Sequence, residues 1–307
     1  MTTATVTMTN SDLCAAYEHC REIARSRARN FYYGLKLTPE PQRSAVYAIY
    51  AWMRTGDDLV DDAESPCEQA KQLEAFEETT RCVLDQGANG EYAVGAPDMW
   101  AAFADSVESF GVHRSDIDAM LNGLREDLDH DGYDTFEDLK RYCGGVASSV
   151  GRVCVTIWGV REGVSMSDAL TLAERRGLAF QLTNILRDFA EDFDEGRVYL
   201  PKDAFDAWDL TPRQLRLWEK PEACAALVNV QSSIARAEFD ASIRLEEMIT
   251  PSCAPTLWAM TRIYSGLLRK IEERPERIVG QARIRLQSLH KAGIAMRALA
   301  RSRRGEW

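Results

Sequence analysis

Apolar residues recur along most of the chain at intervals of three and four, the spacing that places side chains on one face of an α-helix. Alternation with a period of two, which is typical of strands, is hard to find, and runs rich in Ala, Leu, Glu and Arg dominate. The pattern therefore predicts an all-α protein with helices at residues 11–29, 40–63, 66–86, 98–110, 115–129, 135–159, 166–193, 212–218, 221–248, 253–273 and 281–303.

Local signals mark where several helices begin. Thr38 precedes Pro39, which is the pattern of an N-cap residue followed by proline at the first helical position. Thr211 is followed by proline and then by Gln214, which is the spacing of a capping box. We therefore expect helix entries at both places.

The loops between these helices are short. The glycine-rich segment 85–98 and the break at 194–203 lack the length and polarity of a domain linker, and no internal repeat is visible. We expect one domain over residues 1–307, with about ten N-terminal residues and the C-terminal tail loosely ordered.

Composition narrows the class of protein. The chain has 307 residues, of which 45% are hydrophobic and 28% charged, as is typical of soluble globular proteins. Its net charge of −11 argues against a nucleic-acid partner, since such binding needs a basic surface. No signal peptide and no long apolar run is visible, so we expect a cytoplasmic protein without a transmembrane segment, while contact with a membrane surface stays open. The eight cysteines show no CxxC spacing and are expected to be free thiols.

A dense acidic cluster ends the helix predicted at 40–63. In the stretch RTGDDLVDD, Asp57 and Asp61 are four residues apart and share a helix face, with Asp58 and Asp62 on the neighbouring row. The preceding AVYAIYAWM is almost wholly apolar, as in a buried helix. A solvated charge run is the simplest interpretation of this cluster alone, whereas Mg²⁺ bound between the carboxylates would remove their repulsion.

A second polar row runs along the helix predicted at 166–193. Gln181, Asn184, Asp188 and Asp192 follow one another at spacings of three, four and four, so oxygen atoms occur at every turn of one face. The other faces of this segment are apolar, and a surface helix would normally mix Lys and Glu into its polar face. Such a row is expected where a helix lines a polar cavity inside a bundle, as in carboxylate metal sites.

Each acidic cluster alone is a weak signal, but the two share one spacing. Both carry Asp-x-x-x-Asp on a helix with apolar flanks, about 130 residues apart in the chain. We therefore predict that the two rows face each other around divalent cations.

Longer segments around these rows carry a family resemblance. The segments YAIYAWMRTGDDLVDD and QLTNILRDFAEDFDEGRVYLP resemble the two aspartate-rich signatures of the squalene/phytoene synthases. FEDLKRYCGGVASSVGRV resembles the family's central Tyr-Cys segment, RIYSGLLRKIE its C-terminal tyrosine helix, and SRARNFYYGLKLTPEPQRSAVYAIYAW its N-terminal substrate-entry region. The likeness covers roughly residues 20–275.

The resemblance implies a fold and a reaction. The fold is a single all-α isoprenoid-synthase bundle with a central cavity. The reaction is an Mg²⁺-dependent (or Mn²⁺-dependent) head-to-head joining of two prenyl diphosphates, farnesyl or geranylgeranyl, through a cyclopropylcarbinyl diphosphate. Its product is phytoene, dehydrosqualene or presqualene diphosphate, made for carotenoid or for hopanoid and triterpenoid biosynthesis. The protein is then expected to be a prenyl-transferring enzyme.

The resemblance also implies roles for residues in this sequence. The metal ligands would be Asp57, Asp61, Asn184, Asp188 and Asp192, with Asp58 and Asp62 as supporting or solvated charge. Substrate binding would fall to Arg54, Arg187, Gln181, Asn184, Phe31 and Leu35, of which the two arginines would hold diphosphate oxygens. The tyrosines expected to line the reaction cavity are Tyr50, Tyr142 and Tyr264.

Several alternatives stay open at this point. An NADPH-dependent squalene synthase is disfavoured, because the chain shows no glycine-rich dinucleotide fingerprint, although that family would not necessarily use one. A chain elongase or a terpene cyclase would share Mg²⁺ and the first acidic motif but would differ in the second. A non-catalytic assembly factor with this fold would be expected to have lost an aspartate from one of the pairs, and both pairs are intact.

Overall fold

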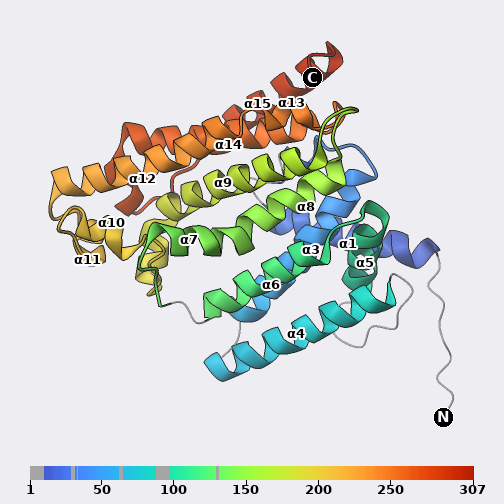
Figure 1. Cartoon of the computed structure of the whole chain (residues 1–307), viewed down its shortest axis with the longest axis horizontal. Coiled ribbons are helices and arrows are strands. Elements are labelled where there is room, and N and C mark those ends of the chain that lie inside the picture. The colour runs from blue at the N-terminus through green and yellow to red at the C-terminus, as the bar shows by residue number, and fades with distance from the viewer. Residues whose placement is uncertain (1–9, 29–31, 33, 62–64, 88–96, 129–130) are drawn as a thin grey trace.

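The computed structural model describes residues 10–28, 32, 34–61, 65–87, 97–128 and 131–307 (Figure 1). These residues form helices and contain no β-strand beyond an isolated bridge between Val160 and Ile249. The α-helices are α1 Asn10–Arg27, α3 Gln42–Asp61, α4 Pro66–Gln86, α5 Pro97–Phe110, α6 Arg114–Leu128, α7 Phe136–Cys143, α8 Ser149–Trp158, α9 Met166–Asp194, α10 Lys202–Asp206, α11 Pro212–Leu217, α12 Pro221–Ala241, α13 Leu245–Met248, α14 Ala254–Glu273 and α15 Ser288–Arg303. The all-α prediction is confirmed.

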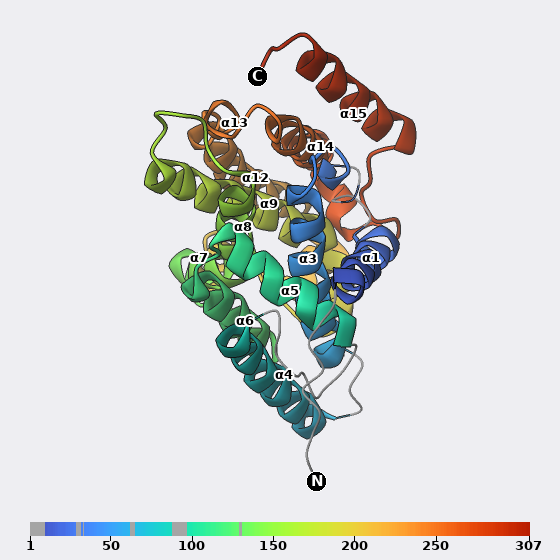
Figure 2. The ribbon, with the colours of Figure 1, turned by 90° about the vertical axis from the view of Figure 1, so that its right-hand side faces the viewer.

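The long helix α9 lies in the middle of the bundle. It packs on α8, α12 and α14, so helices surround it on most sides. On the N-terminal side, α3 packs against α1, α4 and α5. Figures 1 and 2 both place α4 at one edge of the molecule and α15 at the opposite edge. One continuous hydrophobic core extends from Ala16 of α1 to Ala298 of α15.

The helix predicted at 135–159 is interrupted in its middle. A π-helical segment, Gly144–Ser148, joins α7 to α8. Two adjacent glycines give this stretch low helix propensity, and they also let it approach α6 closely. A Cβ on Gly145 would lie 2.9 Å from the Ala119 carbonyl oxygen of α6. The wider turn therefore occurs where two backbones meet, and it places Val146 and Ala147 beside the central cavity.

The helix predicted at 221–248 is also broken, between α12 and α13. The break follows Ser242, which is fully buried. The Ser242 carbonyl accepts a hydrogen bond from Arg176 Nη2 at 2.8 Å, and its hydroxyl accepts one from Arg176 Nε at 2.9 Å. The same carbonyl also accepts the Leu245 backbone N–H at 3.0 Å, so a buried guanidinium from α9 holds the chain in a turn at the point where α12 ends.

The last predicted helix, 281–303, begins seven residues late. Residues 281–287 are not helical, and α15 starts at Ser288. Ile284 and Leu286 are buried in this segment, while Arg283 and Arg285 are exposed. This alternation is the period-two signal of an extended chain, and it is visible in the sequence ARIRLQ.

One predicted helix entry is wrong and another is confirmed. Thr38 does not cap α3, which begins at Gln42; Thr38 is buried, and its hydroxyl lies 2.9 Å from that of Thr256. The carboxylate of Glu40 instead accepts the Ser44 backbone N–H at 3.1 Å. Thr211 caps α11 in the expected capping box with Gln214.

The short helix α10 and a 3-10 helix at Pro275–Val279 were not predicted, since such short turns have little periodicity. All eight cysteines carry free thiols. The expectations for Phe31, for Asp62, for residues 1–9 and for most of the loop at 85–98 lie outside the described residues.

Within the described part of the chain, no helix has both the length and the apolar character needed to cross a membrane.

Candidate active site

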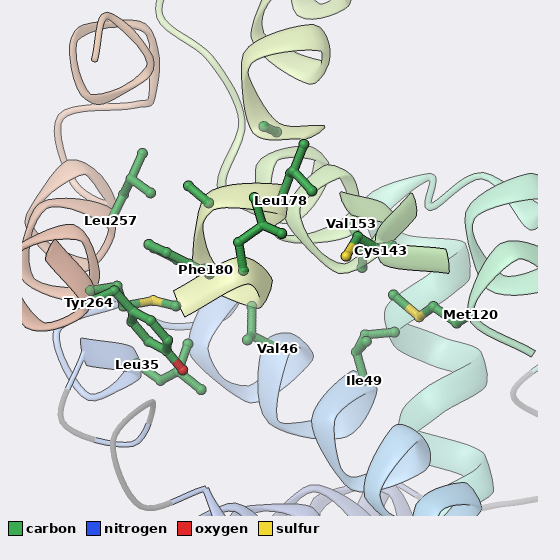
Figure 3. Close-up of a cluster of buried hydrophobic side chains, with 14 of the residues drawn as sticks. Leu35, Val46, Ile49, Met120, Cys143, Val153, Leu178, Phe180, Leu257 and Tyr264 are labelled. Carbon is green, nitrogen blue, oxygen red and sulfur yellow. The ribbon is translucent and has the colours of Figure 1, made fainter. Parts of the chain in front are cut away.

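An apolar cavity of about 230 Å³ lies between α3, α8, α9 and α14. Figure 3 shows side chains from these elements converging, among them Val46 of α3, Phe180 of α9 and Leu257 of α14. The π-helical segment closes one side through Val146 and Ala147. The fold thus provides an interior space that is walled mainly by hydrocarbon.

A few polar side chains also line this cavity. They are Tyr50 of α3, Trp158 of α8, and Arg176, Gln181 and Asn184 of α9. Burial raises the pKa of Tyr50 to about 12, so its phenol stays protonated at neutral pH. Arg176 is tied into the fold by its bonds to Ser242 and by an ion pair with Glu246 at 3.3 Å. Asn184 Nδ2 donates a hydrogen bond to Gln181 Oε1 at 3.3 Å, so the groups of the wall left for a ligand include the Tyr50 hydroxyl, the Trp158 indole N–H and the Asn184 Oδ1 atom.

The two acidic rows begin one helical turn beyond these lining residues. Met53 lines the cavity, and Asp57 follows it by four residues on α3. Asn184 lines the cavity, and Asp188 follows it by four residues on α9. Because residues four apart lie on one helix face, both rows run away from the edge of a single apolar cavity.

Arginines engage the carboxylates of the first acidic cluster, chiefly Asp58 of the neighbouring row. Arg54 is hydrogen-bonded to Asp58 and lies 4.0 Å from Asp57, while Arg27 lies 3.7 Å from Asp58. The Arg54 Nε atom is buried and has no hydrogen-bond partner among the described residues. That nitrogen is a donor available to an oxygen anion. The backbone of Asp61 continues the helix, and the position of its side chain lies outside the description.

In the second row, two arginines each form two hydrogen bonds with one carboxylate. Asp188 accepts hydrogen bonds from Arg187 Nε at 2.8 Å and Nη2 at 2.5 Å, and from Arg283 Nε at 2.7 Å and Nη2 at 2.6 Å. Burial would raise the pKa of Asp188, but the two guanidinium groups hold it below its ordinary value. Arg283 was not predicted as a site residue, because the extended segment that carries it was predicted to be helical.

The second row fits a hard divalent cation in two respects. The Asn184 Oδ1 atom is buried and without a hydrogen-bond partner in the described part of the chain. Burial, and then the charge of Asp188, raises the pKa of Asp192 to about 7. Ionising this carboxyl group is therefore unfavourable, and a cation beside it would offset that cost. Among the described side chains, no three Asp, Glu, His or Cys residues are gathered as a metal site. The shared metal site stays a prediction.

Of the three tyrosines expected in the cavity, Tyr50 lines it directly. The Tyr264 ring stacks on Phe180 at a centroid distance of 4.4 Å and so lies behind a lining side chain. Tyr142 lies in a separate cluster, with its ring 5.4 Å from that of Tyr199. Tyr142 is turned this way because its hydroxyl donates a hydrogen bond to a buried carboxylate.

That carboxylate belongs to Asp127 of α6, which was also not predicted as a site residue. Its Oδ1 atom accepts hydrogen bonds from the hydroxyls of Tyr142 at 2.8 Å and of Tyr199 at 3.2 Å. Burial raises the pKa of Asp127 to about 6, although both tyrosines and Arg197 oppose the rise. The group links α6, α7 and the segment after α9 near the second acidic row.

Asp127 should leave a signature in the pH dependence of stability. A carboxyl whose pKa is raised on folding contributes stability below its unfolded pKa, near 3.9, and loses it as pH rises through about 6. Between pH 5 and pH 8 we expect wild type to lose about 1 kcal/mol relative to Asp127→Asn, as measured by denaturant unfolding. Asp194→Asn is the control. Arg216 holds the pKa of Asp194 below its ordinary value, so the contribution of Asp194 to stability changes only below about pH 4. If the stability difference from wild type does not change between pH 5 and pH 8 for either variant, the raised pKa of Asp127 is contradicted.

Comparison with known proteins identifies the family. The family model described as squalene/phytoene synthase matches residues 24–290. The chain belongs to the squalene/phytoene synthase family. Members of this family are prenyltransferases that condense prenyl diphosphates head to head, and this chain is an enzyme of that class.

Individual members of the squalene/phytoene synthase family match over most of their length. The phytoene synthase of Mycobacterium tuberculosis is 33% identical over 94% of this chain and 91% of its own, and the 15-cis-phytoene synthase of Synechocystis sp. is 30% identical over 84% and 77%. A dehydrosqualene synthase crystallised with a ligand superposes with a TM-score of 0.79 at 24% identity, covering 94% of this chain and 97% of that one. A squalene synthase from Alicyclobacillus acidocaldarius gives 0.76 at 24% identity, over 87% and 96%. The two structures share the fold, and the expected isoprenoid-synthase bundle is confirmed.

Proposed function

We propose that this enzyme condenses two molecules of geranylgeranyl diphosphate, head to head, through a cyclopropylcarbinyl diphosphate to phytoene, in a reaction that depends on Mg²⁺ or Mn²⁺. The observation that carries the proposal is one apolar cavity lined by α3 and α9, each of which carries acidic residues paired with arginines one helical turn beyond its lining residues. The names of the relatives that match across most of the chain support the C40 product.

The polar rim would bind the diphosphate groups. Arg54, Arg187 and Arg283 are placed beside the two acidic rows, and guanidinium groups match diphosphate oxygens in geometry and charge. Asp57, Asp61, Asn184, Asp188 and Asp192 would hold the metal ions. When bound, these ions neutralise the negative charge that develops on the leaving diphosphate.

The cavity wall would direct the hydrocarbon chemistry. Ionisation of an allylic diphosphate leaves a carbocation that water would quench, so the reaction needs a dry apolar space. Side chains such as Val46, Phe180 and Leu257 supply that space. The Tyr50 ring lines it, and an aromatic face stabilises a passing cation by up to about 2 kcal/mol when desolvated. Tyr264 would act through Phe180, against which it stacks.

One assay distinguishes the proposed product from the other products of this reaction class. Purified enzyme is incubated with Mg²⁺ and either farnesyl or geranylgeranyl diphosphate, with and without NADPH, and products are identified by mass spectrometry. We expect phytoene from geranylgeranyl diphosphate without NADPH. Dehydrosqualene or presqualene diphosphate from farnesyl diphosphate would change the substrate but keep the reaction class. Squalene formed only with NADPH would replace the proposal, and the absence of any C30 or C40 product would overturn it.

A further inference from the structure

The C-terminal helix α15 is apolar on two opposite sides. Ile294 and Ala298 are buried, and α15 packs on α14. Leu289, Met296, Leu299 and Ala300 lie on the opposite side and are exposed; we call these four residues the outer face of α15. On a helical projection the outer face lies within about 100° of arc, centred roughly opposite the buried pair.

The outer face is the most exposed apolar surface in the described part of the molecule. Leu289 is 85% exposed and Met296 66% exposed, the two highest values among the large hydrophobic residues described. Figures 1 and 2 both show α15 at the periphery of the bundle. A soluble protein rarely displays clustered large side chains in this way unless the surface meets a partner.

The charge around this face points to the kind of partner. Residues 288–307 hold five basic side chains and one acidic side chain, a net charge of +4, so the other 287 residues carry −15. Arg297 and Arg303 are both exposed, and Arg303 continues the outer face one turn beyond Leu299. A helix with exposed apolar residues and arginines is suited to the interface of an anionic lipid bilayer.

We propose that α15 docks the enzyme on anionic membranes, with the outer face inserted among the lipids and Arg297 and Arg303 at the headgroups. Pairing of two copies through α15 would bring two cationic helices together, which like-charge repulsion opposes. The cavity lies one helix layer behind this surface, since α15 packs on α14, and Leu257 and Met260 of α14 line the cavity. Docking would therefore place the cavity close to the membrane, where apolar polyprenyl chains partition.

Vesicle binding by the full chain tests the proposal without substrate, so its result is independent of the proposed reaction. Co-sedimentation is measured with vesicles of phosphatidylcholine and with an equal mixture of phosphatidylcholine and phosphatidylglycerol. We expect binding to the mixed vesicles that weakens as NaCl is raised. Leu289→Ser/Met296→Ser/Leu299→Ser should weaken it by about tenfold or more, because three buried apolar side chains are lost.

Matched variants separate α15 from general surface effects. Leu217→Ser/Val230→Ser/Ile243→Ser removes three exposed apolar side chains elsewhere and should leave binding unchanged. Arg297→Glu/Arg303→Glu should abolish the preference for anionic vesicles, whereas Arg25→Glu/Lys71→Glu, on α1 and α4, should keep it. Circular dichroism should show the same helix content for all of them, since every altered side chain is exposed.

Two outcomes would overturn the proposal. One is equal weakening by the α15 variant and by its apolar control. The other is no binding to the mixed vesicles, and a dimer in light scattering that the α15 triple variant converts to a monomer would then identify the outer face as an interface between copies.

Discussion

Replacing Asp188 by asparagine is expected to lower kcat/KM for prenyl diphosphates by at least about 100-fold, the size of effect seen when one preorganised charge-stabilising group is removed. Asp188 is the point where the second acidic row meets Arg187 and Arg283. The substitution keeps the shape of the side chain but removes the charge that orders both guanidinium groups and would help to hold a divalent cation. The measurement is steady-state kinetics across a range of Mg²⁺ concentrations.

The control for this variant lies on the same helix. Asp194 also forms a two-bond pair with an arginine, at 2.9 and 2.7 Å from Arg216 Nε and Nη2, but it lies off the polar row. Asp194→Asn should therefore keep activity near that of wild type. Equal activity losses in Asp188→Asn and Asp194→Asn would contradict the assignment of the row.

Stability and activity can be separated at Asp192. Asp188→Asn leaves the largely buried Arg187 without its counter-charge, so some loss of stability is expected along with the loss of activity. Asp192→Asn removes a carboxylate whose pKa is raised to about 7 by burial and by Asp188, so it should keep or raise the melting temperature at pH 8. If Asp192 serves the reaction, its variant is stable and nearly inactive. A stable variant with wild-type activity would remove Asp192 from the site.

The parts of the site that the sequence predicted are those set by local periodicity. Spacings of three and four placed Gln181, Asn184 and Asp188 on one face of α9, and the structure brings that face to the cavity edge. The same rule placed Asp57 one turn beyond Met53 on α3. Within a single helix, the spacing in sequence determines which residues share a face, so these relations could be derived without knowledge of the fold.

The parts that were missed depend on contacts between distant segments. Arg283 reaches Asp188 across 95 residues, and Asp127 meets Tyr199 across 72. Nothing in local sequence identifies such partners, although the alternation at 283–286 could have shown that Arg283 lies on an extended segment. The position of Tyr142 away from the cavity has the same cause, because a buried carboxylate on another helix orients its hydroxyl.

Gly177→Ala should destabilise the protein by about 3 kcal/mol or more, the upper end of the range for overpacking. Gly177 lies in the middle of α9, where it touches the π-helical segment Gly144–Ser148. A Cβ at this position would lie 2.5 Å from the Ala147 carbonyl oxygen and 2.8 Å from Ser148 Cα. Both neighbours are backbone atoms, so neither can turn away as a side chain could. Differential scanning calorimetry should show a clear fall in the melting temperature.

The same substitution at Gly293 should act with the opposite sign. Gly293 lies inside α15, and a Cβ there would meet nothing within 4 Å. Alanine has the higher helix propensity, by up to about 1 kcal/mol, so Gly293→Ala should raise the melting temperature slightly. Helix propensity alone would predict a gain at Gly177 as well. A Gly177→Ala variant at least as stable as wild type would show that α9 and the π-helical segment are not in close contact.

The contact at Gly177 also links stability to the reaction. The π-helical segment supplies Val146 and Ala147 to the cavity wall, so pushing it away from α9 changes the space that shields the carbocation. Gly177→Ala should therefore lose activity even at temperatures where its circular dichroism shows a folded protein, whereas Gly293→Ala should not. Full activity in folded Gly177→Ala would mean that the wall at Val146 and Ala147 does not shape the reaction.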